Sequence, residues 1–322
     1  MDGLKFLPGV QAAKMEVNMI KTENLSKRFG DFTALNAVSC SIPKGSIYGM
    51  VGSNGAGKST FLRLINGVYK PDSGSIAIDG EPVYENPKIK EIISYIPDTL
   101  YFLPGASMNR MAKLYASVYD HFDFQRFKDL TAAFELNPKA NIHSFSKGMK
   151  RQAAIILSLS CRPDYMFFDE TFDGLDPVMR NLVKSLICKD VLERNATAII
   201  TSHSLRELED ICDQLALLHK GGLVLESDIE NLKTKQFKVQ IAFREDFDES
   251  RFSGIPHIHF RKSGSVASMI VQSDKDNTVS ILNSMSPVLL DILPLTLEEV
   301  FTYEMETLGY NFDKVLEEKN EA

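Results

Sequence analysis

Residues 50–60, MVGSNGAGKST, combine glycines, a lysine and adjacent hydroxyls in a pattern suited to binding phosphate. They fit the spacing G-x-x-x-x-G-K-[ST] in full, with Gly52, Gly57, Lys58 and Ser59 at the defined positions. Glycines let consecutive backbone N–H groups turn toward one anion, the lysine reaches the outer phosphates, and the hydroxyl suits Mg²⁺. The pattern therefore predicts a nucleoside triphosphate site.

The residues on either side of this loop predict the elements that hold it. Residues 47–51 indicate a short buried strand, and residues 61–65 have helical character until Gly67 and Pro71 end the run. A helix that starts at the loop directs its first N–H groups and the positive end of its dipole at the anion. Because the spacing and both flanks agree, a chance turn is the weaker interpretation.

A second candidate site lies at the end of another apolar run. Residues 165–168 predict a buried strand that ends in Asp169 and Glu170. Burying two carboxylates without a metal ion or a partner is costly, so this position favours metal binding and catalysis over a solvated turn. A further strand over residues 197–201 precedes His203, which makes His203 a third candidate.

The composition is that of an ordinary globular protein, with 322 residues, 44% hydrophobic and 25% charged, and a net charge of −7. This acidic balance argues against a surface devoted to nucleic acid, so no nucleic-acid partner is expected. The longest apolar stretches are too short to cross a bilayer. The four scattered cysteines indicate buried, reduced thiols rather than a zinc site or a disulfide framework.

The order of the elements predicts an α/β fold. Apolar strands alternate with helices, which implies a sheet covered on both faces. Residues 33–42 predict a half-buried strand, residues 108–119 and 127–134 predict helices of an insertion, and residues 178–194 predict a long helix. The spacing of residues 204–207 predicts a capping box at the start of another helix.

The composition changes near residue 234, which predicts a second, smaller unit. Residues 237–243 alternate between apolar and polar types, and residues 269–271 are a candidate partner strand. Helices are expected over residues 278–285 and 296–305.

The order of the motifs resembles the nucleotide-binding subunit of ATP-binding cassette (ABC) transporters. Over residues 17 to about 230, the phosphate loop is followed by three more motifs of that family: Phe145-Ser146-Lys147-Gly148-Met149 in place of its Leu-Ser-Gly-Gly-Gln signature, Asp169-Glu170 with Gly174-Leu175-Asp176-Pro177, and Thr201-Ser202-His203. Residues 296–301, TLEEVF, also resemble the closing helix of many such subunits.

The resemblance implies an α/β P-loop NTPase with an ABC-type antiparallel β-subdomain and a helical insertion, followed here by a small α+β C-terminal appendage. The expected divisions are a disordered leader over residues 1–16 and the ATPase domain over residues 17–234, with its helical subdomain at about residues 100–160. The appendage follows over residues 235–312, and a charged tail over residues 313–322. Met15 or Met19 is a candidate true start.

The resemblance also implies roles for the matching residues. Phe29 would stack on adenine, and the phosphates would be wrapped by a continuous stretch: Gly52, Ser53, Asn54, Gly55, Ala56, Gly57, Lys58, Ser59 and Thr60. Mg²⁺ would be held by Ser59 and Asp169, Glu170 would be the general base, and His203 would contact the γ-phosphate. The signature residues, which are Ser146, Lys147, Gly148 and Met149, would meet ATP on a second cassette. Asp176 would lie at the dimer seam.

Three departures from the family pattern narrow the resemblance. Lys147 replaces the first glycine of the signature pair, Thr171 replaces the proline that usually follows Asp-Glu, and Asp98 stands where most relatives carry glutamine. A carboxylate still offers oxygen to Mg²⁺, so Asp98 is a further candidate metal ligand. Three segments resemble those of bacterial exporter ATPases of the type-two class, including those for antibiotics and peptides: Pro97-Asp98, Ser146-Lys147-Gly148-Met149 and residues 119–123, YDHFD.

The implied function is an ATP-binding and ATP-hydrolysing subunit that energises export through ATP-driven pairing with a second copy of itself or a homologous cassette. It would lie peripherally at the cytoplasmic face of the cell membrane, bound to separate integral-membrane permease subunits through residues 98 to about 120. Two alternatives stay open: a soluble ABC ATPase without a permease, and a regulatory ATP-binding module with weak hydrolysis. The sequence does not identify the transported substrate.

Overall fold

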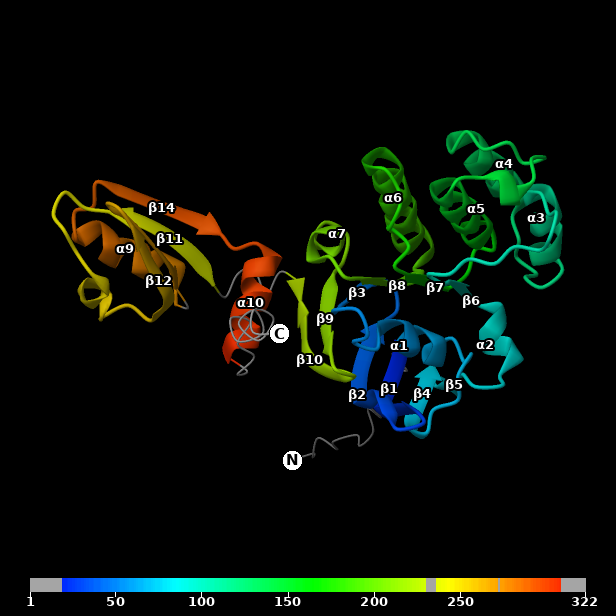
Figure 1. Cartoon of the computed structure of the whole chain (residues 1–322), viewed down its shortest axis with the longest axis horizontal. Coiled ribbons are helices and arrows are strands. Elements are labelled where there is room, and N and C mark those ends of the chain that lie inside the picture. The colour runs from blue at the N-terminus through cyan, green and yellow to red at the C-terminus, as the bar shows by residue number, and fades with distance from the viewer. Residues whose placement is uncertain (1–18, 230–235, 272, 308–322) are drawn as a thin grey trace, which may run out of the picture.

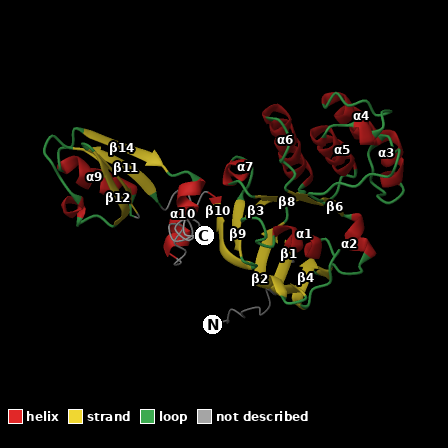
Figure 2. Ribbon diagram, in the orientation of Figure 1, coloured by secondary structure: helices red, strands yellow, loops and turns green. Residues whose placement is uncertain are grey.

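The computed structural model describes residues 19–229, 236–271 and 273–307, with side chains up to residue 302 at the C-terminal end. The expected leader and charged tail, residues 1–16 and 313–322, lie outside these ranges. In Figures 1 and 2 the described chain forms two neighbouring sheets with their helices and a separate C-terminal sheet. The domain boundaries at residues 17, 234 and 312 stay predictions.

The first sheet is antiparallel and contains the strand predicted over residues 33–42. Its order is β2-β1-β4-β5, formed by β1 (Met19–Phe29), β2 (Phe32–Pro43), β4 (Ser73–Ile78) and β5 (Glu81–Pro82). Apolar side chains on one face of β1 and β2 pack in one core with helix α1 (Lys58–Ile65). The sequence analysis did not separate β1, which is the hairpin partner of β2.

The central sheet carries the phosphate loop. Its order is β10-β9-β3-β8-β7-β6, formed by β3 (Ile47–Val51), β6 (Ile93–Ile96), β7 (Tyr165–Asp169), β8 (Thr197–Ser202), β9 (Gln214–His219) and β10 (Gly222–Asp228). β6, β7, β8, β3 and β9 pair in parallel, and β10 closes a hairpin with β9. Every residue of β3, β7 and β8 is buried, as expected for a sheet covered on both faces. The loops that follow these three neighbouring strands therefore emerge at one edge.

The helical insertion lies beyond β6 and packs on itself. It consists of α3 (Met108–Ala116), α4 (Phe124–Ala133), the short 3₁₀ helix η1 (Ile142–Ser144) and α5 (Lys147–Ser160), and both α3 and α4 pack against α5. The helix expected over residues 108–119 ends at Ala116. Its end follows from Ser117, whose hydroxyl donates to the Leu114 carbonyl at 2.7 Å and so takes a carbonyl of the last turn.

The remaining helices flank the sheets. They are α2 (Pro87–Glu91), α6 (Pro177–Arg194) and α7 (Leu205–Glu209). The predicted helix start at Ser204 is confirmed, since Ser204 is the N-cap of α7, but the side-chain hydrogen bond of a capping box is not formed. Glu207 accepts instead from Ser202 Oγ at 2.7 Å and pairs with Arg180 at 3.3 Å, and these two contacts draw its carboxylate away from the Ser204 N–H.

The C-terminal sheet is antiparallel, with the order β12-β13-β11-β14. It consists of β11 (Phe237–Ala242), β12 (His257–Ser263), β13 (Val266–Val271) and β14 (Leu289–Pro294), together with η2 (Glu249–Phe252), α9 (Lys275–Ser284) and α10 (Leu297–Thr307). The predicted pairing of residues 237–243 with residues 269–271 is confirmed, since Phe237 lies opposite Val271. Alternate β11 side chains share an apolar core with Leu282 of α9. Among the described helices, none combines the length and apolarity needed to cross a membrane.

Candidate active site

Strand β3 and helix α1 hold the phosphate loop between them. Gly57 takes the N-cap position of α1 with a φ of 109°, a backbone conformation that residues other than glycine rarely adopt. A Cβ atom there would also lie 2.6 Å from the Ala34 carbonyl oxygen. At the other end of the loop, a Cβ on Gly52 would lie 2.4 Å from the Leu218 carbonyl oxygen. A side chain at either position would therefore collide with neighbouring backbone, so both positions require glycine.

Lys58 is buried and folds back across the loop. Its Nζ donates to the carbonyl oxygens of Gly52 at 2.6 Å and Ser53 at 3.3 Å. The same atom lies 3.0 Å from Oε1 of Glu170. The predicted lysine and the predicted general base are thus brought into direct contact, and the cation is aimed into the loop.

Asp169 is fully buried, and hydroxyl groups satisfy its carboxylate. Ser59 Oγ donates to Oδ1 at 3.0 Å, Thr201 Oγ1 donates to the same oxygen at 2.9 Å, and the Tyr95 hydroxyl donates to Oδ2 at 3.2 Å. Burial and the nearby Asp169 charge raise the pKa of Tyr95, which keeps it a donor. Ser59 and Asp169 together offer only oxygen atoms, the donor type that Mg²⁺ prefers.

Tyr95 and Thr201 are functional neighbours that the sequence analysis did not assign. Both lie in strands, β6 and β8, that flank β7 and its terminal Asp169. The available signal was the presence of polar residues in two buried strands, β6 and β8. That signal has meaning only once the strand order is known.

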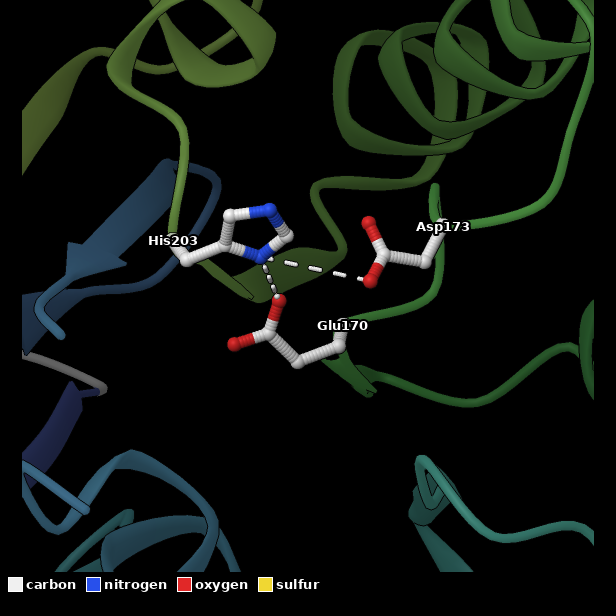
Figure 3. A group of neighbouring side chains, drawn as sticks. All are labelled: Glu170, Asp173 and His203. Atoms are coloured by element: carbon white, nitrogen blue, oxygen red, sulfur yellow. Dashed lines mark hydrogen bonds and ion pairs between the residues drawn. The ribbon is translucent and has the colours of Figure 1, made fainter. Parts of the chain in front are cut away.

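Glu170, Asp173 and His203 gather beside this network (Figure 3). Nδ1 of His203 lies 2.9 Å from Oε2 of Glu170 and 3.9 Å from Oδ2 of Asp173. Burial opposes ionisation of Glu170, but hydrogen bonds from His203 and Lys58 outweigh it and lower its pKa. The hydrogen bond to Glu170 raises the pKa of His203. Glu170 is therefore an ionised carboxylate held between the Lys58 ammonium and the His203 imidazole.

Glu170, Asp173 and His203 line a cavity of about 450 Å³. The cavity gathers many of the predicted site residues: Asn54, Gly55, Ala56, Gly57, Lys58, Ser59, Thr60, Asp98, Lys147, Glu170 and His203. Three lining residues were not predicted, namely Phe32, Ala34 and Asp173. The cavity has the size and the charged lining that a nucleotide requires.

Two aromatic residues at the turn between β1 and β2 differ in their relation to this cavity. Phe32 is 61% exposed and lines it, whereas Phe29 is 44% exposed and is outside the lining. The Phe29 ring packs edge-on against Tyr69 with a centroid distance of 5.3 Å, below the Lys27 ammonium. The assignment of Phe29 to adenine stays a prediction, and Phe32 is a second candidate.

The predicted signature residues lie around the start of α5. Ser146 caps this helix by accepting a hydrogen bond from the Met149 N–H at 3.2 Å. Gly148 lies close to the loop before α6, because a Cβ on it would be 2.9 Å from the Gly174 carbonyl oxygen. Asp176 caps α6 by accepting from the Met179 N–H at 2.9 Å. Ser146, Gly148, Met149 and Asp176 are not part of this chain's own cavity lining.

Asp98 lies at the rim of the cavity and pairs with a buried arginine. Nη2 of Arg151 lies 3.2 Å from Asp98 Oδ1, and Nη1 donates to the Pro97 carbonyl at 3.2 Å. The Asp98 side chain is 55% exposed, so part of its carboxylate faces the cavity and solvent.

Comparison with known proteins agrees with this geometry. A family model described as ABC transporter matches residues 35–173. The chain is 32% identical over 284 residues to the ABC transporter ATP-binding protein YtrB of Bacillus subtilis (strain 168), a match that covers 88% of this chain and 97% of YtrB. The chain belongs to the ABC transporter ATP-binding proteins.

Two further similarities support the assignment of this ABC subunit. The bacitracin transport ATP-binding protein BcrA of Bacillus licheniformis is 30% identical over 302 residues, which cover 87% of this chain and 94% of BcrA. A solved ATP-binding subunit of an ABC transporter superposes with a TM-score of 0.62 at 25% identity, covering 67% of this chain and 92% of that one.

These findings confirm the expected family, the P-loop NTPase fold and the ATPase activity. The ABC subunit binds and hydrolyses ATP and energises transport. The roles of single residues stay predictions.

Proposed function

We propose that this ABC ATP-binding subunit powers an exporter of the type-two class. The observation that carries the ATPase part of the proposal is the direct contact of Glu170 with both Lys58 and His203, beside the Asp169–Ser59 pair. The similarity to a bacitracin transport ATP-binding protein along nearly its whole length supports an antibiotic or peptide as the class of exported molecule.

In the proposed reaction the phosphate loop and Lys58 bind the phosphates of ATP. Ser59 and Asp169, with Asp98 as a further ligand, would hold Mg²⁺, which neutralises charge on the outer phosphates. Glu170 is ionised, so it accepts the proton of the attacking water. His203 donates a hydrogen bond to the γ-phosphate and orients Glu170.

We further propose that two cassettes close on two ATP molecules. Ser146, Gly148 and Met149 lie outside the lining of the chain's own cavity, whereas Lys147 lines it, and all four lie at the N-terminus of helix α5, a position that favours an anion. Ser146, Lys147, Gly148 and Met149 would there meet ATP held by the second cassette, with Asp176 at the seam. The pair would lie at the cytoplasmic face of the membrane, with the permease on the surface formed by residues 98 to about 120.

The test is the behaviour of Glu170→Gln in the full-length protein. Loss of the base should stop hydrolysis while ATP binding persists, so size-exclusion chromatography with ATP and Mg²⁺ should show a dimer. Glu91→Gln, at an exposed position outside the cavity, is the matched control and should hydrolyse ATP and return to monomer. A Glu170→Gln protein that stays monomeric with saturating ATP would contradict closure of two cassettes.

The membrane partner is tested separately by expressing the chain with its neighbouring permease genes. Co-purification of an integral membrane protein on a tag fused to this subunit is the expected result. An active dimer that brings no membrane protein with it would instead support the soluble ABC ATPase.

A further inference from the structure

Helix α7 begins two residues after His203, at Leu205, and has only five residues. A helix of this length is not stable by itself, and its N-cap residue Ser204 contributes no side-chain hydrogen bond. Its Leu208 side chain is buried in the large apolar core of the ATPase part. The elements that pack on α7 therefore determine where the segment carrying His203 lies.

Helix α10 is one of these elements, although it lies at the far end of the described chain. Figure 1 shows α10 between the C-terminal sheet and α7, and the two helices pack against each other. Leu297, Val300 and Phe301 are buried in the same apolar core as Leu208. At the surface, Arg206 donates to Glu298 through Nε at 3.2 Å and Nη2 at 3.0 Å.

The start of α10 is itself fixed at two points. Thr296 and Glu299 form a capping box, in which the Thr296 N–H donates to Glu299 Oε2 at 3.0 Å and the Glu299 N–H donates to Thr296 Oγ1 at 3.2 Å. Glu299 Oε1 also lies 2.9 Å from Nζ of Lys238 in β11. Helix α10 thus connects α7 to the C-terminal sheet.

From α7, fixed contacts lead to the catalytic residues. Glu207 accepts from Ser202 Oγ at 2.7 Å, and this hydroxyl accepts from the Ser204 N–H at 2.9 Å, so the residues on both sides of His203 are held. Glu207 also pairs with Arg180, which donates to the Leu175 carbonyl at 3.4 Å in the loop before Asp176. A shift of α7 would therefore move His203.

We propose that α10 is a positioning element for His203, which keeps the imidazole against Glu170 by supporting α7 and makes ATP hydrolysis depend on the placement of the C-terminal sheet. This inference rests on the proposed catalytic role of His203. The C-terminal sheet would thereby control hydrolysis, although it contributes no residue to the lining of the ATP cavity.

The experiment compares two leucines that are both 0% exposed in the full-length protein, Leu297 in the core shared with α7 and Leu282 in the core of the C-terminal sheet. Leu297→Ala should lower kcat about 10-fold, because displacing a catalytic group by an ångström lowers turnover by up to about 100-fold. KM for ATP should stay within about twofold, since the phosphate loop is untouched. Hydrogen exchange of residues 203–209 should speed up, and Leu297→Met should restore both properties.

Leu282→Ala should leave kcat and exchange at residues 203–209 unchanged, even if it lowers overall stability. Equal effects of the two alanine variants on kcat, or unchanged exchange in Leu297→Ala, would overturn the inference. If Leu297→Ala does not fold, the exposed pair Arg206 and Glu298 replaces it, with side chains 79% and 45% exposed. Glu298→Arg should then lower kcat, and adding Arg206→Glu should restore it; no loss, or no restoration, overturns the inference.

His203→Ala separates this inference from the proposed function. Lost hydrolysis in His203→Ala together with a fully active Leu297→Ala would reject only the positioning role of α10. Retained hydrolysis in His203→Ala would reject the catalytic role of His203 and the inference that rests on it.

Discussion

Nδ1 of His203 lies 2.9 Å from Oε2 of Glu170, and Oε1 of the same carboxylate lies 3.0 Å from Nζ of Lys58. One carboxylate therefore connects the phosphate loop with the segment after β8. The three residues meet because β3, β8 and β7 are adjacent parallel strands whose carboxyl ends share one edge of the sheet. A change in any one of these side chains must alter the charge or the position of the others.

The first prediction concerns the imidazole. In Glu170→Gln the pKa of His203 should fall toward its ordinary value of 6.5, because the hydrogen bond to the Glu170 carboxylate is the main cause of its rise. NMR titration of the imidazole in the full-length protein without nucleotide measures this shift, with Glu91→Gln as the control. A His203 pKa that is the same in wild type and Glu170→Gln would show that the contact does not persist in solution.

The same pair predicts a pH window for stability. The pKa of Glu170 is lowered from 4.5, so its contribution is present above 4.5 and is lost as the pH falls through the lowered value. The pKa of His203 is raised from 6.5, so its contribution is full below 6.5 and is lost as the pH rises through the raised value. The stability difference between wild type and His203→Gln should therefore be largest from pH 4.5 to 6.5.

Urea unfolding at several pH values measures this difference. Because the His203 side chain is half exposed, solvent screens the pair, and the maximum difference should stay below about 1 kcal/mol. A difference that increases above the raised pKa of His203 would contradict the assigned sign.

Lys58→Ala should weaken ATP binding about 10- to 100-fold, because a charge-assisted hydrogen bond to phosphate contributes about 1.5–3 kcal/mol. The variant also removes the ammonium group that lies beside the Glu170 carboxylate. Isothermal titration with ATP measures the change, and Lys139→Ala, an exposed lysine outside the cavity lining, is the matched control. Equal affinities of the two variants would exclude Lys58 from the phosphate site.

Local sequence patterns sufficed to predict the elements that hold the site. Gly52, Gly57, Lys58 and Ser59 have the spacing of a phosphate loop, and the apolar runs before Asp169 and His203 mark buried parallel strands. Those patterns involve residues close together in the chain, so they can be read without knowing how distant segments pack. The pairing of residues 237–243 with residues 269–271 followed from strict alternation in the same way.

What the sequence did not reveal depends on strand order or on contacts between distant segments. Tyr95 and Thr201 serve Asp169 only because β6 and β8 flank β7. Strands β12 and β14 are edge strands with many exposed residues, so their pattern resembles a loop until β13 and β11 pair with them. The capping box at Thr296 was not predicted, although Thr296 and Glu299 have the same spacing as Ser204 and Glu207.

The variant Asp98→Asn tests whether Asp98 is a ligand of Mg²⁺ in addition to Ser59 and Asp169. If Asp98 contributes a charged oxygen to Mg²⁺, the variant needs a higher Mg²⁺ concentration for half-maximal ATPase activity, by about threefold or more. The Arg151 pair is weakened in the same variant, so thermal unfolding separates a loss of stability from a loss of metal affinity. An unchanged Mg²⁺ dependence would leave Ser59 and Asp169 as the protein ligands.

Phe32→Ala should weaken ATP binding if Phe32 stacks on adenine, by roughly 5- to 100-fold, because stacking of a base on an aromatic ring contributes about 1–3 kcal/mol. Phe29→Ala is the matched variant across the β1–β2 turn, where the ring is engaged with Tyr69. The geometry favours Phe32, since it alone of the two lines the cavity.

Binding of inorganic tripolyphosphate distinguishes a stacking role from damage to the loop. This probe has no base, so removal of the adenine-stacking residue should weaken ATP binding and leave tripolyphosphate binding within about twofold. If Phe29→Ala shows that selective loss and Phe32→Ala does not, the resemblance-based assignment of Phe29 holds and the turn must rearrange when ATP binds. Loss of affinity for both probes would instead mean that the hairpin supports the phosphate loop, because Ala34 of β2 contacts Gly57.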